Sequence, residues 1–156
     1  MSVTSFAAGC FWGVENTFSK IDGVINTRVG YQGGHKENPS YEDVCTGDTG
    51  HAEVVQVEFD EDIVSFGELL NTFWNCHNPT TQNRQGADVG SQYRSVIFVE
   101  NEAQKEIAEL SKSSLEASGR FQDPIVTEIF INGAFFIAEE YHQKYFEKNG
   151  VGACSI

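Results

Sequence analysis

The chain has 156 residues, of which 40% are apolar and 21% are charged, so it is long enough and apolar enough to bury a core of its own. Asp and Glu outnumber Lys and Arg by 23 to 10, and the cations form no cluster, which argues against binding to a nucleic-acid backbone. No apolar run approaches the roughly 20 residues of a membrane span, and no signal-like segment opens the chain. We therefore expect one cytoplasmic domain with no nucleic-acid or membrane partner.

Four cysteines stand at positions 10, 45, 76 and 154, and no two of them form a Cys-x-x-Cys pair. A structural zinc site usually shows two close pairs of ligands, so we expect no metal. Four cysteines in a chain of this length also do not indicate a disulfide scaffold. The positions of Cys45, before a turn, and Cys76, near the end of an apolar helix, favour structural roles.

A strand over residues 2–7 and a helix over residues 10–19 are the first predicted elements. The strand is a short apolar run that stops at Gly9. The helix is indicated by apolar side chains at helical spacing, namely Phe11, Val14 and Phe18. This order predicts a strand, a tight turn and a helix, with Cys10 on the first turn of the helix.

The position of Cys10 favours a reactive thiol. Free backbone N–H groups and the positive end of the helix dipole favour an anion there, so the pKa of a cysteine falls below its usual value of roughly 8.5. The alternative is a small buried side chain, which is what most free cysteines are. The adjacent rings of Phe11 and Trp12 offer an apolar seat for a methyl group, although Phe11 also fits the core.

A second strand over residues 24–31 leads into a long glycine-rich loop that continues to Tyr41. Glycines let the backbone of such a loop approach another group closely, and loops of this length are unusual unless they are functional. Tyr31 and Tyr41 lie at the edges of this loop, and Tyr93 lies at the edge of a later one. A phenol in such a place can donate a hydrogen bond to a substrate oxygen, and packing at the edge of the core is the alternative.

The strand over residues 54–59 alternates between apolar and polar residues. Glu53 has the same parity as Val55 and Val57, so its carboxyl group is expected to point with the apolar side chains. Burial would raise its pKa and keep it protonated near neutral pH, as a general acid requires. The alternative is a solvated charge at the end of the strand, and Asp88, in a later loop, has the same two interpretations.

The second half of the chain is predicted to add three helices and two strands. Ser65 and Asn101 are positioned to cap the first two helices, the second of which extends to about Ala117 with Ile107 and Leu110 on its inner face. The remaining elements are a polar loop at 80–92, a buried strand ending at Val99, a strand at 125–131 and a helix at 138–148.

The last eight residues, 149–156, are expected to form a flexible tail that carries Cys154. A mobile thiol can reach an active-site sulfur without disturbing the fold, so Cys154 suits a resolving cysteine that condenses with a sulfenic acid on Cys10. A disordered terminal residue is the alternative. Because strands and helices interleave and one strand alternates, we predict an α+β fold in two layers, with helices packed on a mixed sheet, in a single catalytic domain over residues 1–156.

Several blocks of the sequence resemble the peptide methionine sulfoxide reductase A family in the family's own order. The signature is Gly9-Cys10-Phe11-Trp12-Gly13-Val14-Glu15. Further matching blocks lie at residues 38–41, 47–55, 83–86, 88–95 and 138–143. The resemblance covers nearly the whole chain, and it implies a ferredoxin-like two-layer α/β sandwich with long coil segments.

The resemblance also implies the activity, which is reduction of the S epimer of methionine sulfoxide, free or in proteins. Cys10 would be the nucleophile, Phe11 and Trp12 would hold the methyl group, and Glu53 would give a proton to the sulfoxide oxygen. The oxygen would also accept hydrogen bonds from two phenols, and a carboxylate would order the pocket through water. These residues are Tyr41, Tyr93 and Asp88.

Recycling of the nucleophile is implied in the same way. Cys154 would resolve the sulfenic acid in a disulfide with Cys10, and thioredoxin would reduce that disulfide, with no bound cofactor. Some family members carry a second tail cysteine, which this chain lacks, so we expect a single resolving step. Ala153 stands where the family often has an aromatic residue, which leaves the docking of the tail open.

Two other functions stay open on the residues alone. One is a thiol hydrolase that pairs Cys10 with a histidine, since such partners meet only in the fold. The other is a non-enzymatic binding module that uses the surface of Phe11 and Trp12. A reductase forms an intramolecular disulfide when it meets its substrate and a hydrolase does not, whereas a binding module would bind methionine sulfoxide without forming methionine.

Overall fold

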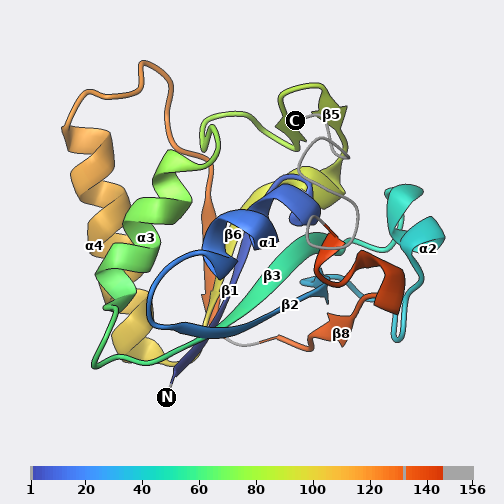
Figure 1. The fold of residues 1–156 in the computed structure, drawn as a ribbon. Coiled ribbons are helices and arrows are strands. Elements are labelled where there is room, and N and C mark those ends of the chain that lie inside the picture. The colour runs from blue at the N-terminus through green and yellow to red at the C-terminus, as the bar shows by residue number, and fades with distance from the viewer. Residues whose placement is uncertain (1, 132, 146–156) are drawn as a thin grey trace.

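The structure, a computed structural model, describes residues 2–131 and 133–145. Its centre is a six-stranded mixed sheet in the order β7-β6-β1-β3-β2-β8 (Figure 1). The strands are β1 Ser2–Ala8, β2 Val24–Gln32, β3 Ala52–Phe59, β6 Ser95–Val99, β7 Glu128–Ile131 and β8 Phe136–Ile137. Neighbouring strands are antiparallel except for β6 and β7, which are parallel. The predicted α+β class with a mixed sheet is confirmed.

Four α-helices accompany this sheet in the described part of the chain. They are α1 Phe11–Ser19, α2 Tyr41–Cys45, α3 Phe66–Asn75 and α4 Glu102–Ala117. Four short elements complete the set, the two-residue strands β4 Arg84–Gln85 and β5 Asp88–Val89 and the 3-10 turns η1 Ser91–Tyr93 and η2 Glu140–His142. Helices α1 and α3 cover one face of the sheet, and α4 packs beside α3 against β6 and β7 (Figure 1).

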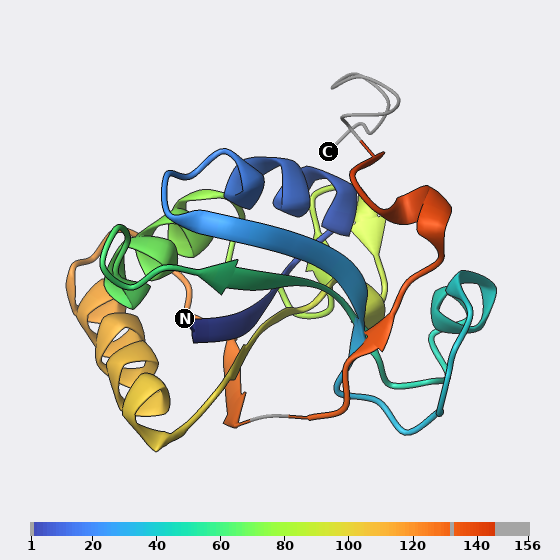
Figure 2. The same cartoon turned by 60° about the horizontal axis from the view of Figure 1, so that its bottom comes forward.

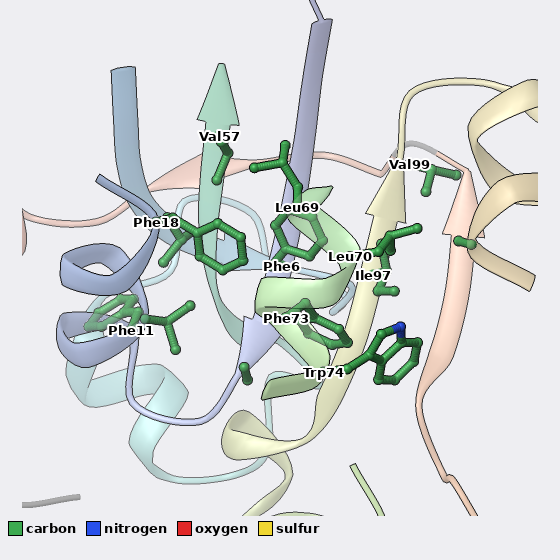
Figure 3. Packing of buried hydrophobic residues seen from close by; sticks show 14 of the residues in the cluster. Phe6, Phe11, Phe18, Val57, Leu69, Leu70, Phe73, Trp74, Ile97 and Val99 are labelled. Carbon is green, nitrogen blue, oxygen red and sulfur yellow. The ribbon is translucent and has the colours of Figure 1, made fainter. Parts of the chain in front are cut away.

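The main core lies between the sheet and these helices. Phe6, in the middle of β1, stacks on Phe18 of α1 with ring centroids 4.7 Å apart and lies 5.3 Å from Phe73 of α3 (Figure 3). The opposite face of the sheet carries a smaller apolar cluster of Ala7, Ala52, Val54, Val96 and Phe98. Every residue of β6 is buried, which agrees with the prediction of a central strand.

Both predicted helix caps are present. The Ser65 hydroxyl accepts the N–H of Glu68, and the Asn101 side chain accepts the N–H of Gln104. The predicted inner face of α4 is wrong, because Ile107 and Leu110 are 45% and 62% exposed.

The face of α4 that does pack is partly polar, which explains the error. Gln104 is buried, where its side-chain oxygen accepts hydrogen bonds from the Thr4 hydroxyl and the Glu100 N–H. Ser111 accepts the indole N–H of Trp74 at 2.8 Å. A search for apolar periodicity passes over such a stripe, because its contacts are hydrogen bonds as well as apolar packing.

The predicted helix over residues 138–148 is also wrong over residues 138–144, whereas Tyr145 is helical and residues 146–148 lie outside the described residues. Here the chain forms only the short turn η2, and side chains hold it to β2. Both polar atoms of the Gln143 side chain bond to the backbone of Val29, each at 2.9 Å, as a neighbouring strand would. We call residues 138–145 the C-terminal strap.

The glycine-rich segment between β2 and β3 contains one helix that the sequence reading missed, α2. Ser40 caps it in a reciprocal arrangement with Asp43. Ahead of it, the buried ring of His51 accepts the N–H of Gly34 at 3.0 Å, and its other nitrogen lies 2.7 Å from the Lys36 carbonyl oxygen. The loop is therefore fixed to the start of β3.

In the part of the chain that the structure describes, no helix combines the length and the apolar character that a membrane crossing requires.

Replacement of Gly34 should destabilise the fold, because a Cβ there would collide with two backbone atoms, the Thr49 carbonyl oxygen and the amide nitrogen of His51. We expect Gly34→Ala to lower the free energy of unfolding by about 1–3 kcal/mol, since backbone atoms cannot move aside cheaply. Urea denaturation measures this. The matched control is Gly67→Ala on the exposed start of α3, where the nearest atom lies 3.7 Å away and no loss is expected. An equal loss in both variants would contradict the explanation.

Candidate active site

The predicted nucleophile, Cys10, stands where the chain leaves β1 and enters α1. It is the N-cap residue of α1, one position ahead of the first turn in which we predicted it, and its carbonyl oxygen accepts the N–H of Val14 at 3.4 Å. The first turn of α1 contains no acidic residue, so the positive end of the helix dipole is not neutralised from within the helix. Such an end favours an anion.

The turn at Gly9, just before Cys10, lets the hairpin of β4 and β5 pack closely against the chain. Gly9 has a φ of +102°, and a Cβ there would meet the Gln85 side chain at 2.8 Å. Gln85 lies in β4 and bonds through its side chain to both the N–H and the carbonyl oxygen of Asn78. The hairpin of β4 and β5 is thereby held beside the start of α1.

Glu53 lies on β3 with its carboxyl group against the first residue of α1. Its Oε1 accepts the N–H of Phe11 at 3.2 Å, and the residue is 2% exposed. Burial raises the pKa of this carboxyl group to about 8, with a further increase from the carboxylate of Asp88 and a partial decrease from the Phe11 hydrogen bond. Its Oε2 has no hydrogen-bond partner among the described residues. The site therefore contains a carboxylic acid that is largely neutral at pH 7.

Two phenols lie within electrostatic range of this acid. Tyr41 opens α2 and Tyr93 closes η1, and both are half-buried. Burial raises the pKa of both hydroxyls, that of Tyr93 to about 12, and Glu53 acts in the same direction. Both phenols therefore stay protonated at neutral pH and can donate hydrogen bonds to an oxygen. The Tyr41 hydroxyl is hydrogen-bonded to the thiol of Cys45.

Asp88 reaches the same site from β5. It is half-buried, and its carboxylate raises the pKa of both Glu53 and Tyr93, which places it near these two groups. The structure thus brings together seven of the eight residues to which the family resemblance gives a role. They are Cys10, Phe11, Trp12, Tyr41, Glu53, Asp88 and Tyr93. The eighth, Cys154, lies outside the described residues.

An aromatic wall adjoins the acid and the phenols. Phe11 is buried, with ring centroids 6.5 Å from Trp12 and 6.4 Å from Tyr41. Trp12 is half-buried and stacks on Tyr145 at 3.9 Å. Figure 2 shows the C-terminal strap, in red, passing the end of α1 at which these residues lie.

Two residues of the strap were not recognised from the sequence. Glu139 accepts the hydroxyl of Tyr31 and the N–H of Tyr41, each at 2.9 Å, and so fixes the start of α2. His142 accepts the indole N–H of Trp12 at 2.9 Å. The only signal available was that the block 138–143 matches the reductase family, and that match carried no role for either residue.

The thiol pKa is raised in both of the other described cysteines, which lowers the fraction of thiolate near neutral pH. Burial raises the pKa of Cys76 to about 12, and its Sγ lies 3.3 Å from the Phe73 carbonyl oxygen. Burial also raises the pKa of Cys45, although its hydrogen bond to Tyr41 opposes the increase. Among the described residues, no group of three His, Cys, Asp or Glu is arranged to hold a metal ion.

The arrangement can protonate an oxygen while a thiol attacks the atom that bears it. The acid and the two phenols supply O–H donors, the start of α1 favours a thiolate, and the aromatic wall accommodates an apolar group. A small polar group attached to a methyl or similar apolar substituent fits this chemistry.

The sequence matches the family described as peptide methionine sulfoxide reductase over residues 2–156. The peptide methionine sulfoxide reductase MsrA of Methanothermobacter thermautotrophicus is 62% identical over 152 residues, which cover 97% of this chain and 90% of that protein.

Solved structures agree with this match. The reduced form of Mxr1 from Saccharomyces cerevisiae superposes with a TM-score of 0.89 at 35% identity, over 97% of this chain and 87% of that one. The same yeast protein in complex with Trx2 gives a TM-score of 0.64 at 26% identity, over 92% of this chain and 83% of that one.

The buried carboxyl group should make stability depend on pH. Its pKa is higher in the folded protein than in the unfolded chain, so folding takes up a proton and stability falls as pH rises from about 4.5 to about 8. Glu53→Gln cannot ionise. We therefore expect it to exceed the unsubstituted protein in stability at about pH 9 and to match it at about pH 4, as measured by urea denaturation.

The control for this pH series is Glu58→Gln. This substitution removes a carboxylate from the same strand, five positions after Glu53. We expect this variant to follow the unsubstituted protein at both pH values. A Glu53→Gln protein that shows the same pH dependence as the unsubstituted protein would contradict the assignment of the buried proton to Glu53.

Proposed function

Because the chain belongs to the peptide methionine sulfoxide reductase family, we propose that its site reduces the S epimer of methionine sulfoxide, free or within proteins, through a sulfenic acid on Cys10. The family makes the chain a methionine sulfoxide reductase. The observation that carries the mechanism is the neutral carboxyl group of Glu53, bonded to the first N–H of the helix that begins at Cys10.

We also propose that the fold is a ferredoxin-like two-layer sandwich with long coil segments. Removal of the edge strands β7 and β8 leaves the antiparallel order β6-β1-β3-β2. Helix α1 connects β1 to β2 and helix α3 connects β3 to β6, so the chain order is βαββαβ. This order of elements and strands is the pattern of that fold.

The site would hold the sulfoxide through its methyl group and its oxygen. Its methyl group would lie against Phe11 and Trp12, which form an apolar seat, and its oxygen would face the O–H groups of Glu53, Tyr41 and Tyr93. Asp88, which lies near both Glu53 and Tyr93, would order this polar side through water. With the methyl group on the apolar wall, the oxygen on the polar wall and the sulfur facing the Cys10 thiolate, three directions around sulfur would be fixed, which would let the site distinguish the two epimers.

The chemical step transfers oxygen from one sulfur to another. The Cys10 thiolate attacks the sulfoxide sulfur and forms a bond between the two sulfurs while Glu53 gives its proton to the oxygen, because a sulfoxide is a poor electrophile until its oxygen is protonated. The hydroxyl group so formed then moves to the Cys10 sulfur as the S–S bond and the S–O bond of the substrate break, so methionine leaves and Cys10 becomes a sulfenic acid that carries the proton from Glu53. The substrate sulfur gains two electrons and Cys10 loses two.

We assign resolution to Cys154. Its thiol would attack the sulfenic acid, form a disulfide with Cys10 and release water. The raised pKa values of Cys45 and Cys76 make them weaker candidates. Tyr145 stacks on Trp12, and Cys154 follows nine positions later, a stretch that spans up to about 30 Å when extended. A flexible tail over residues 149–156 would therefore start within reach of Cys10.

We propose that thioredoxin, acting in the cytoplasm, reduces this disulfide. A structural relative from yeast, Mxr1, has been solved in complex with Trx2. With a dithiol as external reductant, the cycle consumes one sulfoxide and one dithiol and forms methionine, a disulfide and water. The balance closes without any bound cofactor.

A thiol hydrolase is less well supported. Both ring nitrogens of His51 are engaged by the backbone of the loop at residues 34–36, and those of His77 by the Phe73 carbonyl oxygen and the Ser95 hydroxyl. Burial also lowers the pKa of His77 to about 4. Neither of these two rings has a nitrogen left to act as the base of a cysteine hydrolase. His142 packs against Phe11 and Tyr41, but its Nδ1 already accepts the indole N–H of Trp12.

Loss of the Cys154 thiol should leave reduction of the sulfoxide intact and block regeneration of Cys10 by thioredoxin. We expect Cys154→Ser to release one equivalent of methionine per enzyme from a methyl sulfoxide substrate, because Cys10 can still be oxidised, and then to stop even when thioredoxin is supplied. Rapid quench and amino-acid analysis count the methionine. The matched control Cys76→Ser, whose hydroxyl can keep the bond to the Phe73 carbonyl oxygen, should turn over normally, and Cys10→Ser should release none.

Two outcomes of this series would overturn parts of the mechanism. Normal thioredoxin-dependent turnover by Cys154→Ser would remove Cys154 from the resolving role, and mass spectrometry of the oxidised protein would then show which cysteine pairs with Cys10. Activity in Cys10→Ser would exclude Cys10 as the nucleophile.

The proton on Glu53 should also limit the rate at high pH. We expect kcat/KM for the sulfoxide to fall as pH rises through about 8, where the carboxyl group ionises. Glu53→Gln cannot donate a proton, so its kcat should be lower by roughly 10²–10⁴-fold and this alkaline limb should be absent. A pH series of initial rates measures both effects, and a Glu53→Gln enzyme with nearly full kcat would exclude the carboxyl group as the acid.

A further inference from the structure

The indole ring of Trp12 is held on its edge and on its face by the C-terminal strap. Its N–H donates to Nδ1 of His142 at 2.9 Å, and the ring of Tyr145 stacks on it at 3.9 Å with an interplanar angle of 10°. An indole can donate one hydrogen bond and accept none, so this contact fixes the direction in which its edge points. Trp12 is only half-buried, so packing alone encloses it incompletely.

The acceptor imposes one chemical form on His142. Nδ1 can accept the indole N–H only if it carries no proton, so the imidazole must be neutral with its proton on Nε2. The residue is fully buried, and burial lowers its pKa, which favours this neutral form. Nε2 has no hydrogen-bond partner among the described residues. The contact to Trp12 is thus the hydrogen bond that this ring is seen to make.

Neighbouring aromatic rings hold the plane of the imidazole. The ring centroid of His142 lies 4.1 Å from Tyr141, 4.5 Å from Tyr41 and 5.2 Å from Phe11. Two of these residues, Tyr41 and Phe11, belong to the candidate site itself. Because the ring is enclosed from several sides, its Nδ1 presents a fixed acceptor to the indole.

We propose that His142 is a positioning residue for Trp12, whose indole it holds in the orientation that seats the methyl group of the sulfoxide. The proposal rests on the function proposed above, because it assigns His142 a part in binding that substrate. His142 does not act on the sulfoxide oxygen. Its effect reaches the substrate only through the indole ring.

This role predicts which kinetic constant changes. The methyl group contacts the seat both in the bound substrate and in the transition state, so a misplaced indole weakens both equally. Loss of the acceptor should therefore raise KM and leave kcat nearly unchanged. Substitution of Glu53, which acts on the charge that develops in the transition state, is expected to lower kcat and leave KM nearly unchanged.

Three substitutions at His142 separate the hydrogen bond from the bulk of the ring. Asn carries its side-chain oxygen near the position of Nδ1, Gln carries its amide near that of Nε2, and Phe fills the space without an acceptor. We expect His142→Asn to keep KM close to that of the unsubstituted enzyme. His142→Phe and His142→Gln should raise it roughly three- to tenfold, the value of one hydrogen bond.

A double-mutant cycle tests whether the effect passes through Trp12. In a Trp12→Phe enzyme no indole N–H remains to be held, so His142→Phe should cost nothing further in KM. A purely structural role would raise KM by the same factor in both backgrounds. Unfolding midpoints of all variants identify any that fail to fold, and those that fold carry the cycle.

Tryptophan fluorescence gives a readout that needs no catalysis. Trp74→Phe leaves Trp12 as the one remaining indole of the chain, because the sequence contains two tryptophans. In this background, His142→Phe should make Trp12 more accessible to acrylamide quenching, and His142→Asn should not.

Three results would overturn the proposal. They are a His142→Asn enzyme as impaired as His142→Phe, an equal cost of His142→Phe in the Trp12→Phe background, and quenching that does not respond to residue 142. Failure of the proposed function has a different signature, an active Cys10→Ser enzyme, and would leave the fluorescence result standing.

Discussion

The hydrogen bond from the Phe11 N–H to the Glu53 carboxyl group joins the strand that carries the acid to the helix that begins at the thiol. The sheet register makes this bond possible. Phe6 lies opposite Val55 in the antiparallel pair of β1 and β3, so β1 ends and α1 begins beside Glu53. A slip of one residue would turn Glu53 to the other face of the sheet. The apolar core that fixes the register therefore also brings the acid to the thiol.

The same burial makes the two reactive forms compatible at one pH. A neutral carboxyl group can give up a proton and does not repel a nearby thiolate. An ionised carboxylate has no proton to give and repels the thiolate. Burial of Glu53 and the charge of Asp88 favour the neutral form, while the start of α1 favours the anion at Cys10. Helix α1 thus contributes twice, through the Phe11 N–H that orients the acid and through the end that favours the thiolate.

The sequence predicted the parts of this arrangement that depend on periodicity and missed those that depend on side-chain hydrogen bonds. The parity of Glu53 with Val55 and Val57 predicted the face of the sheet to which its side chain points, because strand alternation is a backbone property, but it left open whether the carboxyl group is buried or solvated. The inner face of α4 was predicted wrongly because Gln104 and Ser111 pack through hydrogen bonds. The helix predicted from residue 138 was wrong because Gln143 bonds to β2 instead of supporting a helix, and the roles of Glu139 and His142 depend on contacts more than 90 residues away in the sequence.

The C-terminal strap ties the end of the described chain to three elements around the site, α2, β2 and α1. Glu139 holds α2, Gln143 extends β2, and Lys144 bonds to the buried carboxylate of Glu15 in α1. Because these contacts come from side chains rather than from a helix, each residue of the strap can reach a different element. The strap thereby fixes Tyr145 on Trp12, the ring proposed to seat the substrate, and Cys154 follows Tyr145 by nine positions in the sequence. Substrate binding and the proposed resolving step would then depend on the same stretch of chain, and a change that loosens the strap would weaken both.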